Sequence, residues 1–199
     1  MTRVAIVDSG GANIASLLFA FERLGVAAEL TTDGDVIGAA ERVVLPGVGA
    51  ARDAMQRLED ANLVEVIRRL EQPVLGICLG MQLLCDASEE DDVDCLGIIP
   101  GVVRKLKVGP DCPVPNMGWC ATSATAAHPV LSDIEQGSWF YYLHSYALPI
   151  SSSTIAMARH TEDFSAMVCR NNFLAAQFHP ERSSHAGARL LQNFLEWQL

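Results

Sequence analysis

The segment Gly76-Ile77-Cys78-Leu79-Gly80 places one cysteine between two glycines, after an apolar run and before residues with helical spacing. This pattern is typical of a nucleophile elbow, a sharp turn from strand to helix that lifts a nucleophile out of a sheet. The turn leaves no room for side chains two positions away, which explains the glycines. A helix N-terminus beneath the sulfur favours the thiolate, the reactive form of cysteine. Most free cysteines are small buried residues, so the elbow alone only favours a catalytic Cys78.

A cysteine nucleophile also needs a base, and the base needs a group that orients it. The segment Phe178-His179-Pro180-Glu181 offers both, directly after a second apolar run. Pro180 restricts the backbone after the histidine, and Glu181 is close enough in sequence to reach back to the imidazole. A single histidine is more often structural than catalytic. Since no metal-ligand spacing joins the other histidines convincingly, we assign structural roles to His128, His160 and His185.

A third segment, Pro46-Gly47-Val48-Gly49, ends an apolar run at 42–45. Acyl transfer requires donors for a developing oxyanion, and glycines free backbone N–H groups to point at a ligand. An ordinary tight turn is the simpler interpretation of this segment alone. Three such segments, each at the end of an apolar run, are hard to attribute to chance.

These segments must be positioned by elements that bring strand ends together. The first half predicts strands at 3–8, 28–32, 42–45 and 73–77, separated by helices that include 52–70 and 79–87. The second half predicts strands at 101–106, 138–142, 155–158, 167–170 and 173–177, divided by turn residues, and a final helix at 186–197. The fold class is therefore α/β: a central, mostly parallel twisted sheet flanked by helices, with antiparallel or hairpin strands in the second half. We expect a single domain over 1–199.

Composition narrows the functional classes. The 199 residues are 50% hydrophobic and 19% charged, which excludes disorder as the main state. A net charge of -10 disfavours binding to nucleic acid or an anionic membrane. No apolar run approaches the roughly 18 residues of a membrane span. The chain enters its first strand without a signal-peptide pattern, so we expect a cytoplasmic protein. The six cysteines contain no Cys-x-x-Cys pair, which makes disulfides and zinc weak interpretations.

Together these residues resemble the class I, triad-type glutamine amidotransferases, which hydrolyse L-glutamine to glutamate and ammonia through a γ-glutamyl thioester. The resemblance rests on Pro46-Gly47-Val48-Gly49, 76–82 and Phe178-His179-Pro180-Glu181. It implies that Cys78 is the nucleophile, His179 the general base and acid, and Glu181 the orienting carboxylate. It implies no cofactor and no metal. By the same resemblance the oxyanion donors are Gly47, Val48, Gly49 and Leu79, and the substrate-binding residues are Gln82, Glu90, His144, Ser145 and Tyr146.

Glu90 lies in the acidic stretch 88–94, whose other carboxylates we interpret as solvated. The resemblance places the Glu90 carboxylate against the substrate's α-ammonium, a charge-assisted contact.

Longer motifs resemble one branch of this family, the glutaminase subunits of imidazole glycerol phosphate synthase in histidine biosynthesis. They are Val114-Pro115-Asn116-Met117-Gly118-Trp119, Tyr142-Leu143-His144-Ser145-Tyr146 and Glu181-Arg182-Ser183. The resemblance spans essentially the whole chain and implies a heterodimer with a (β/α)8-barrel cyclase subunit that receives the ammonia. The residues that it places at this interface are Asn116, Met117, Trp119, Cys120 and Arg182.

The sequence departs from the family pattern twice. Cys120 stands where the family usually has asparagine, near the expected cyclase interface, and Ser9 stands where many members have tyrosine. Two alternatives to the whole interpretation are also open. One is a glutaminase on the same scaffold that serves another synthase, or a γ-glutamyl hydrolase. The other is a non-enzymatic redox sensor whose exposed elbow cysteine is oxidised.

Overall fold

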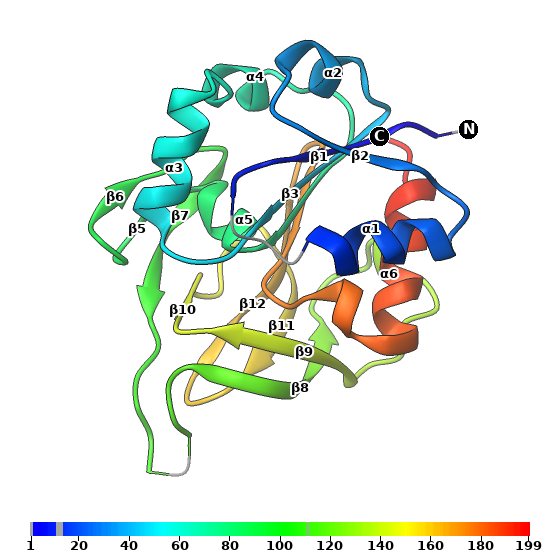
Figure 1. Ribbon diagram of the computed structural model, residues 1–199. Helices are drawn as coiled ribbons and strands as arrows, with labels where there is room; N and C mark the ends of the chain where they lie inside the picture. The colour runs from blue at the N-terminus through cyan, green and yellow to red at the C-terminus, as the bar shows by residue number, and fades with distance from the viewer. Residues whose placement is uncertain (1, 11–13, 111) are drawn as a thin grey trace.

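The computed structural model describes residues 2–10, 14–110 and 112–199. Within these residues a nine-stranded sheet forms the centre of the molecule (Figure 1). Its first five strands in spatial order run parallel, and the remaining pairs are antiparallel, as the change of pattern along the sequence predicts. In spatial order the strands are β2 (Ala28–Thr31), β1 (Val4–Val7), β3 (Arg42–Gly47), β4 (Val74–Cys78), β13 (Phe173–Ala176), β12 (Asp163–Arg170), β11 (Thr154–Arg159), β8 (Asn116–Ala124) and β9 (Ser138–His144).

Helices cover both faces of the parallel strands, which is why these strands are apolar without alternation. Along β1, Val4 and Ile6 join the core that packs under α1 (Ile14–Arg23) and α6 (Ser184–Glu196). Ala5 and Val7 face the opposite core, which the remaining helices cover. Those helices are α2 (Gly34–Ala39), α3 (Ala51–Asp60), α4 (Val64–Arg68) and α5 (Leu79–Leu83). The predicted α/β class with a flanked, mostly parallel sheet is confirmed.

Two predicted helices are wrong in extent. The helix expected over 52–70 is two helices, because the backbone turns at Asn62, where φ is 58°. The apolar residues on both sides of the break are buried: Leu58, Leu63 and Ile67. Their helical spacing therefore continues across the break, and for this reason the sequence pattern predicts one helix. The helix expected over 79–87 ends at Leu83.

A strand begins directly after that helix, in a smaller four-stranded sheet. This sheet is made of β10 (Tyr146–Ala147), β7 (Ile99–Lys105), β5 (Cys85–Ser88) and β6 (Val93–Asp94). The acidic stretch 88–94 therefore belongs to β5, β6 and the turn between them. Its carboxylates other than Glu90 are exposed, as expected for solvated groups. Two short 3-10 turns, η1 (Pro129–Leu131) and η2 (Pro180–Arg182), complete the elements.

The large sheet curls so that its outermost strand, β9, returns to the carboxyl ends of the parallel strands. The backbone N–H of His179 donates to the Tyr141 carbonyl over 2.9 Å, although β9 is four strands away from β13 in the sheet order. This return closes a pocket over the end of β4. No helix within the described ranges has the length and apolar character needed to cross a membrane.

Candidate active site

Cys78 stands at the turn between β4 and α5, with φ 54° and ψ -110°. Few non-glycine residues adopt such a positive φ, and strained residues of this kind concentrate at functional sites. The flanking glycines are required by space. A Cβ on Gly76 would lie 2.8 Å from Leu84 Cδ1, and a Cβ on Gly80 would overlap the Leu45 carbonyl oxygen. The strand-to-helix elbow predicted from the sequence is present.

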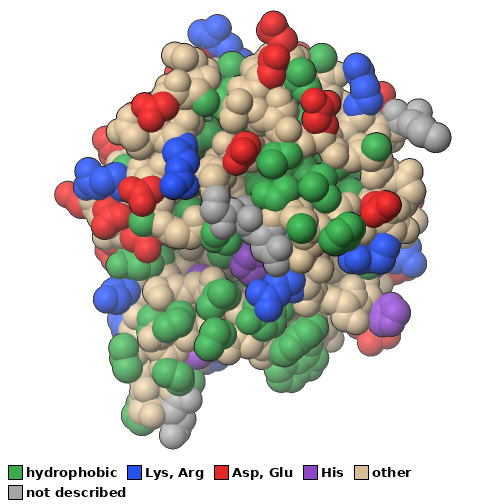
Figure 2. Space-filling view, in the orientation of Figure 1, with side chains coloured by type: hydrophobic (Ala, Val, Ile, Leu, Met, Phe, Trp, Pro, Cys, Tyr) green, Lys and Arg blue, Asp and Glu red, His purple; other side chains and the backbone are tan. Residues whose placement is uncertain are grey.

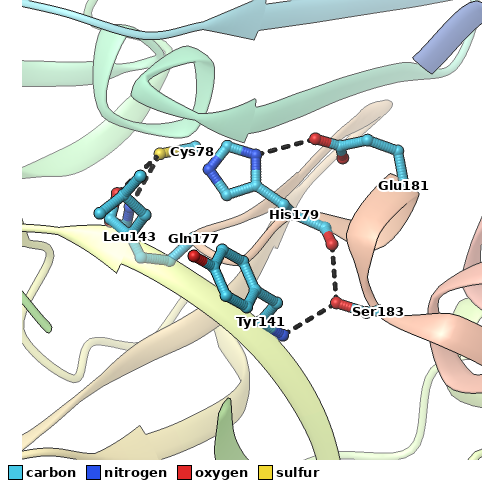
Figure 3. A network of polar contacts seen from close by, with 7 residues as sticks. All are labelled: Cys78, Tyr141, Leu143, Gln177, His179, Glu181 and Ser183. Atoms are coloured by element: carbon cyan, nitrogen blue, oxygen red, sulfur yellow. Dashed lines mark hydrogen bonds and ion pairs between the residues drawn. The ribbon is translucent and has the colours of Figure 1, made fainter. Parts of the chain in front are cut away.

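His179 and Glu181 lie next to Cys78, as Figure 3 shows. His179 Nδ1 is 2.9 Å from Glu181 Oε1, and both side chains are buried. Pro180 opens the η2 turn, which places Glu181 back against the imidazole. The Ser183 hydroxyl donates to the His179 carbonyl over 2.6 Å and accepts from the Tyr141 N–H over 2.9 Å. Ser183 therefore ties the histidine backbone to β9, a role for which the sequence gives no signal beyond its closeness to Glu181.

The pKa of His179 is set by opposing effects. Burial lowers it, but the hydrogen bonds to Cys78 and Glu181, together with the charges of both groups, outweigh burial and raise the pKa to about 10. The imidazole is then cationic at neutral pH, between a sulfur and a carboxylate. A cation in this position stabilises a thiolate beside it, which is what a nucleophilic cysteine needs.

The sulfur of Cys78 has two further polar neighbours. The Leu143 carbonyl oxygen on β9 lies 3.6 Å from Sγ, and Gln177 Nε2 lies 3.9 Å from it (Figure 3). Gln177 is fully buried and also accepts a hydrogen bond from Gln82 Nε2 over 3.1 Å. We did not predict Gln177 from the sequence. Its position two residues before His179, on the same side of an extended segment, is the signal that would have found it.

A cavity of about 290 Å³ opens over Cys78, His179 and Glu181. The structure brings to it all five residues predicted to bind substrate and three of the four predicted oxyanion residues. They are Gln82, Glu90, His144, Ser145, Tyr146, Val48, Gly49 and Leu79. Gly47 lies behind this group: it pairs with Cys78 across β3 and β4, and a Cβ there would come within 3.0 Å of Leu79 Cβ.

Glu90 lines the cavity and also holds a helix. Its Oε2 accepts from the Ala51 N–H, the first residue of α3, over 3.1 Å. Burial raises the pKa of Glu90, the bond from Ala51 lowers it, and the charge of Asp91 raises it again, for a net upward shift. Among the residues that the structure describes, Ala51 is the one donor to this carboxylate, which retains room for a second, external donor.

The residues predicted at a partner interface differ in exposure, because side chains along β8 point alternately to its two faces. Met117 and Trp119 are 67% and 48% exposed, whereas Asn116 is buried and Cys120 is half-buried. Asn116 therefore faces inward and is not on the surface, whereas Cys120, on the same side of β8, is partly exposed. Arg182 lies at the cavity, with its guanidinium 4.2 Å above the Tyr141 ring. Figure 2 shows hydrophobic side chains gathered over the β8 and β9 region.

Residues 5–197 match the family described as glutamine amidotransferase class-I, and the chain belongs to that family. It is 48% identical over 199 residues to "Imidazole glycerol phosphate synthase subunit HisH" of Vibrio cholerae, a match that covers 97% of this chain and 98% of the relative. The subunit of the same name from Xylella fastidiosa is 48% identical over 196 residues, covering 98% of both chains.

Solved structures with lower identity share the fold. A structure described as a glutamine amidotransferase superposes with a TM-score of 0.75 at 17% identity, covering 97% of both chains. PurLQS from Thermotoga maritima superposes with a TM-score of 0.70 at 19% identity, covering 98% of both chains.

Proposed function

We propose that this chain is the glutaminase subunit of imidazole glycerol phosphate synthase in histidine biosynthesis. It hydrolyses L-glutamine and delivers the ammonia to a separate cyclase subunit. The observation that carries the proposal is the placement of His179 between Cys78 and Glu181 at the cavity, in a chain 48% identical to such subunits over nearly its whole length. The 199 residues act as one glutaminase domain, and the cyclase chemistry belongs to the partner.

In the proposed reaction, the Cys78 thiolate attacks the γ-carboxamide carbon of glutamine and forms a carbon–sulfur bond. The carbonyl oxygen becomes an oxyanion, which the backbone N–H groups of Val48, Gly49 and Leu79 stabilise. Gly47 keeps the strand close behind the elbow. The His179 imidazolium gives its proton to the departing nitrogen, so the carbon–nitrogen bond breaks and neutral ammonia leaves.

Hydrolysis of the resulting thioester completes the cycle. His179, now neutral, takes a proton from water as the water oxygen attacks the same carbon. The carbon–sulfur bond then breaks and restores the Cys78 thiolate. The new γ-carboxyl group loses its proton to solvent, and glutamate leaves. Glu181 accepts from the imidazole Nδ1–H throughout, which fixes the ring and stabilises its cationic form. It does not itself receive the proton.

Substrate recognition follows from the charges at the cavity. The Glu90 carboxylate is the group we assign to the α-ammonium of glutamine, since an ammonium supplies the second donor that this carboxylate has room for. Gln82 and the segment 144–146 form the wall beside the reacting amide.

The partner we propose is a (β/α)8-barrel cyclase that binds as a heterodimer over the exposed face of β8 and β9. Met117, Trp119, Trp139 and Leu143 are large apolar residues that each expose more than a third of their surface here. A partner is needed because ammonia released into water is protonated and lost as a nucleophile. We place the reaction in the cytoplasm, where reducing conditions suit six free cysteines.

The test is reconstitution. The chain is mixed with the cyclase, and glutamate formation from glutamine is followed with and without the cyclase's ribotide substrate. Glutamate formation should depend on the cyclase and its ligand, and Cys78→Ser should abolish it. Full activity in Cys78→Ser would exclude the proposed nucleophile. Activity that ignores this cyclase and responds to another synthase would exclude the proposed pathway.

A further inference from the structure

A buried network of side chains converges on one backbone carbonyl, that of Tyr146. Its oxygen lies 2.9 Å from Gln82 Nε2 and 2.9 Å from His144 Nδ1. A carbonyl can only accept, so both nitrogens must carry hydrogen. This single acceptor thus fixes which end of the Gln82 amide is NH₂ and which ring nitrogen of His144 is protonated.

The orientation of Gln82 in turn fixes Gln177. The second hydrogen on Gln82 Nε2 points to Gln177 Oε1 over 3.1 Å. Since that atom of Gln177 accepts, its other amide atom is the NH₂ donor, and this donor faces the sulfur of Cys78 at 3.9 Å. Both amide side chains are buried, with exposures of 4% for Gln82 and 0% for Gln177. Packing therefore leaves Gln177 little freedom to turn its donor away.

The Cys78 sulfur therefore lies between a hydrogen-bond acceptor, which favours the thiol, and a hydrogen-bond donor, which favours the thiolate. The Leu143 carbonyl, 3.6 Å from Sγ, accepts a hydrogen from the thiol and cannot favour an anion. An amide N–H instead interacts more strongly with a thiolate than with a thiol, because the acceptor is then charged. The donor of Gln177 accordingly gains strength at the moment when the Cys78 proton leaves.

We propose that Gln177 donates a hydrogen bond to the Cys78 thiolate, and that Gln82 is a positioning residue that aims this donor from the Tyr146 carbonyl. The inference rests on the proposed function, in which Cys78 is the nucleophile. It gives Gln82 a task besides lining the substrate cavity, and it adds to the reaction a residue outside the triad.

The other branch of the network keeps the Tyr146 carbonyl in place. With hydrogen on Nδ1, the neutral His144 ring accepts at Nε2 from Asn116 Nδ2 over 3.1 Å. Burial lowers the pKa of His144 to about 4, with the neighbouring histidines adding to the effect of burial and the bond to Tyr146 opposing it. The ring therefore stays neutral near neutral pH. Nδ1 remains the donor to the Tyr146 carbonyl, and Nε2 remains the acceptor from Asn116.

The experiment measures Cys78 directly, without turnover. The intact chain is alkylated with iodoacetamide between pH 5 and pH 10, and the modification of the Cys78 peptide is quantified by mass spectrometry. Replacing the donor in Gln177→Met should move the midpoint of the rate–pH curve upward by about one unit, which is roughly tenfold less thiolate at a fixed lower pH. Gln82→Met should shift the midpoint in the same direction by a smaller amount. The Gln177 amide is still present in this variant, but the hydrogen bond from Gln82 no longer orients it.

Gln72→Met is the matched control. The Gln72 amide donates to the Ile37 carbonyl at 3.1 Å and to the Gly38 carbonyl at 3.4 Å, just before the start of β4. The substitution removes these two contacts and the bond that Gln72 Oε1 accepts from the Glu71 N–H, but it should leave the Cys78 midpoint unchanged. If Gln177→Met does not fold, Gln177→Glu retains the acceptor for Gln82 and replaces the donor, and it should raise the midpoint further.

An unchanged midpoint in folded Gln177→Met, or in Gln177→Glu, would overturn the inference. In the complex with the cyclase, Gln177→Met should lower kcat and leave KM near the wild-type value, whereas a substrate-binding role would raise KM. Failure of the proposed function has a different signature: the Cys78→Ser chain would retain glutaminase activity, whatever the alkylation curves of the other variants show.

Discussion

Replacing Glu181 with glutamine removes a charge from the imidazole and leaves its acceptor in place. Glu181 Oε1 lies 2.9 Å from His179 Nδ1, and only 5% of the Glu181 side chain is exposed. In Glu181→Gln the introduced amide oxygen is not required to move to reach the same Nδ1–H, so the tautomer and the ring position should persist. The variant therefore isolates the electrostatic contribution of the carboxylate.

The size of the effect follows from the pKa of His179. Its rise from 6.5 to about 10 corresponds to roughly 5 kcal/mol at 1.36 kcal/mol per unit, after burial has acted against it, and Cys78 and Glu181 share the favourable part. Because the carboxylate is one of two groups that stabilise the cationic imidazole, Glu181→Gln should lower kcat about 10- to 100-fold. His179→Ala removes the base itself and should cost about 10²- to 10⁴-fold.

Two assays check this division of roles. Glutaminase activity of the complex gives kcat for Glu181→Gln and His179→Ala. NMR titration of the imidazole in Glu181→Gln should place its pKa below that of the wild type. Because the folded-state pKa is raised, the stability that His179 contributes is fully present below about pH 6.5 and is lost as the pH rises toward 10; in the variant this loss should be complete at a lower pH. Equal losses of kcat in both variants, or an unchanged imidazole pKa, would refute the reasoning.

Four other outcomes are expected. Gly80→Ala should lose activity and about 1–3 kcal/mol of unfolding free energy in urea melts, because its Cβ overlaps the Leu45 carbonyl, whereas Gly38→Ala, with open space around it, should not. Glu90→Gln should raise the KM for glutamine at least about tenfold with a smaller change in kcat, since a charge-assisted contact is lost. Between pH 6.5 and 4 the free energy of unfolding should fall by about 3 kcal/mol, because buried His144 stays neutral while the unfolded chain binds a proton there. In urea melts His144→Gln should lack this part of the pH dependence, and equal pH dependence in both proteins would contradict the assignment. Met117→Asp should weaken cyclase binding at least about tenfold by calorimetry, and Phe19→Asp, a similarly exposed apolar site on α1, should not.

Much of the site could be predicted from the sequence because its functional residues follow the ends of strands. Strand ends are visible in the local sequence pattern, and parallel pairing brings them to one edge of the sheet. The elbow at Cys78 is defined by glycines whose absence of side chains is a local steric need. The closeness of His179 to Cys78 follows from the parallel pairing of β13 with β4, which places both strand ends at one edge. Glu181 follows from the turn that Pro180 opens. Each of these inferences needs only neighbouring residues and one sheet rule.

Other features depended on tertiary structure. Helix periodicity continues through Leu58, Leu63 and Ile67, so the spacing alone hides the turn at Asn62. The short α2, by contrast, has a local signal in the sequence although we did not predict it: Asp33 is its N-cap and accepts from the N–H groups of Asp35 and Val36. The contact of Leu143 with Cys78 has no sequence signal, because it arises only when the sheet curls and its far edge returns to β4.

Both residues that depart from the family pattern make side-chain hydrogen bonds in this structure. Ser9 donates its hydroxyl to the Pro46 carbonyl over 2.7 Å in the core, which ties the end of β1 to the strand that carries Gly47. Cys120 donates its thiol to Asn116 Oδ1 over 3.5 Å. Burial raises the pKa of Cys120, against the bond to Asn116 that lowers it, so the group remains a thiol and a donor at neutral pH.

The Cys120 thiol also fixes the direction of the hydrogen bonds next to it. With Oδ1 occupied by the Cys120 thiol, Asn116 must present its NH₂ to His144, and His144 must present its N–H to the Tyr146 carbonyl. The Cys120 thiol therefore sets the direction of the bonds from β8 as far as the Tyr146 carbonyl, to which Gln82 donates separately. Met117 and Trp119, which alternate with Asn116 and Cys120 along β8, are exposed on the opposite face of that strand. Because His144 and Tyr146 line the cavity, the bond from Asn116 connects the inner face of β8 to the cavity wall.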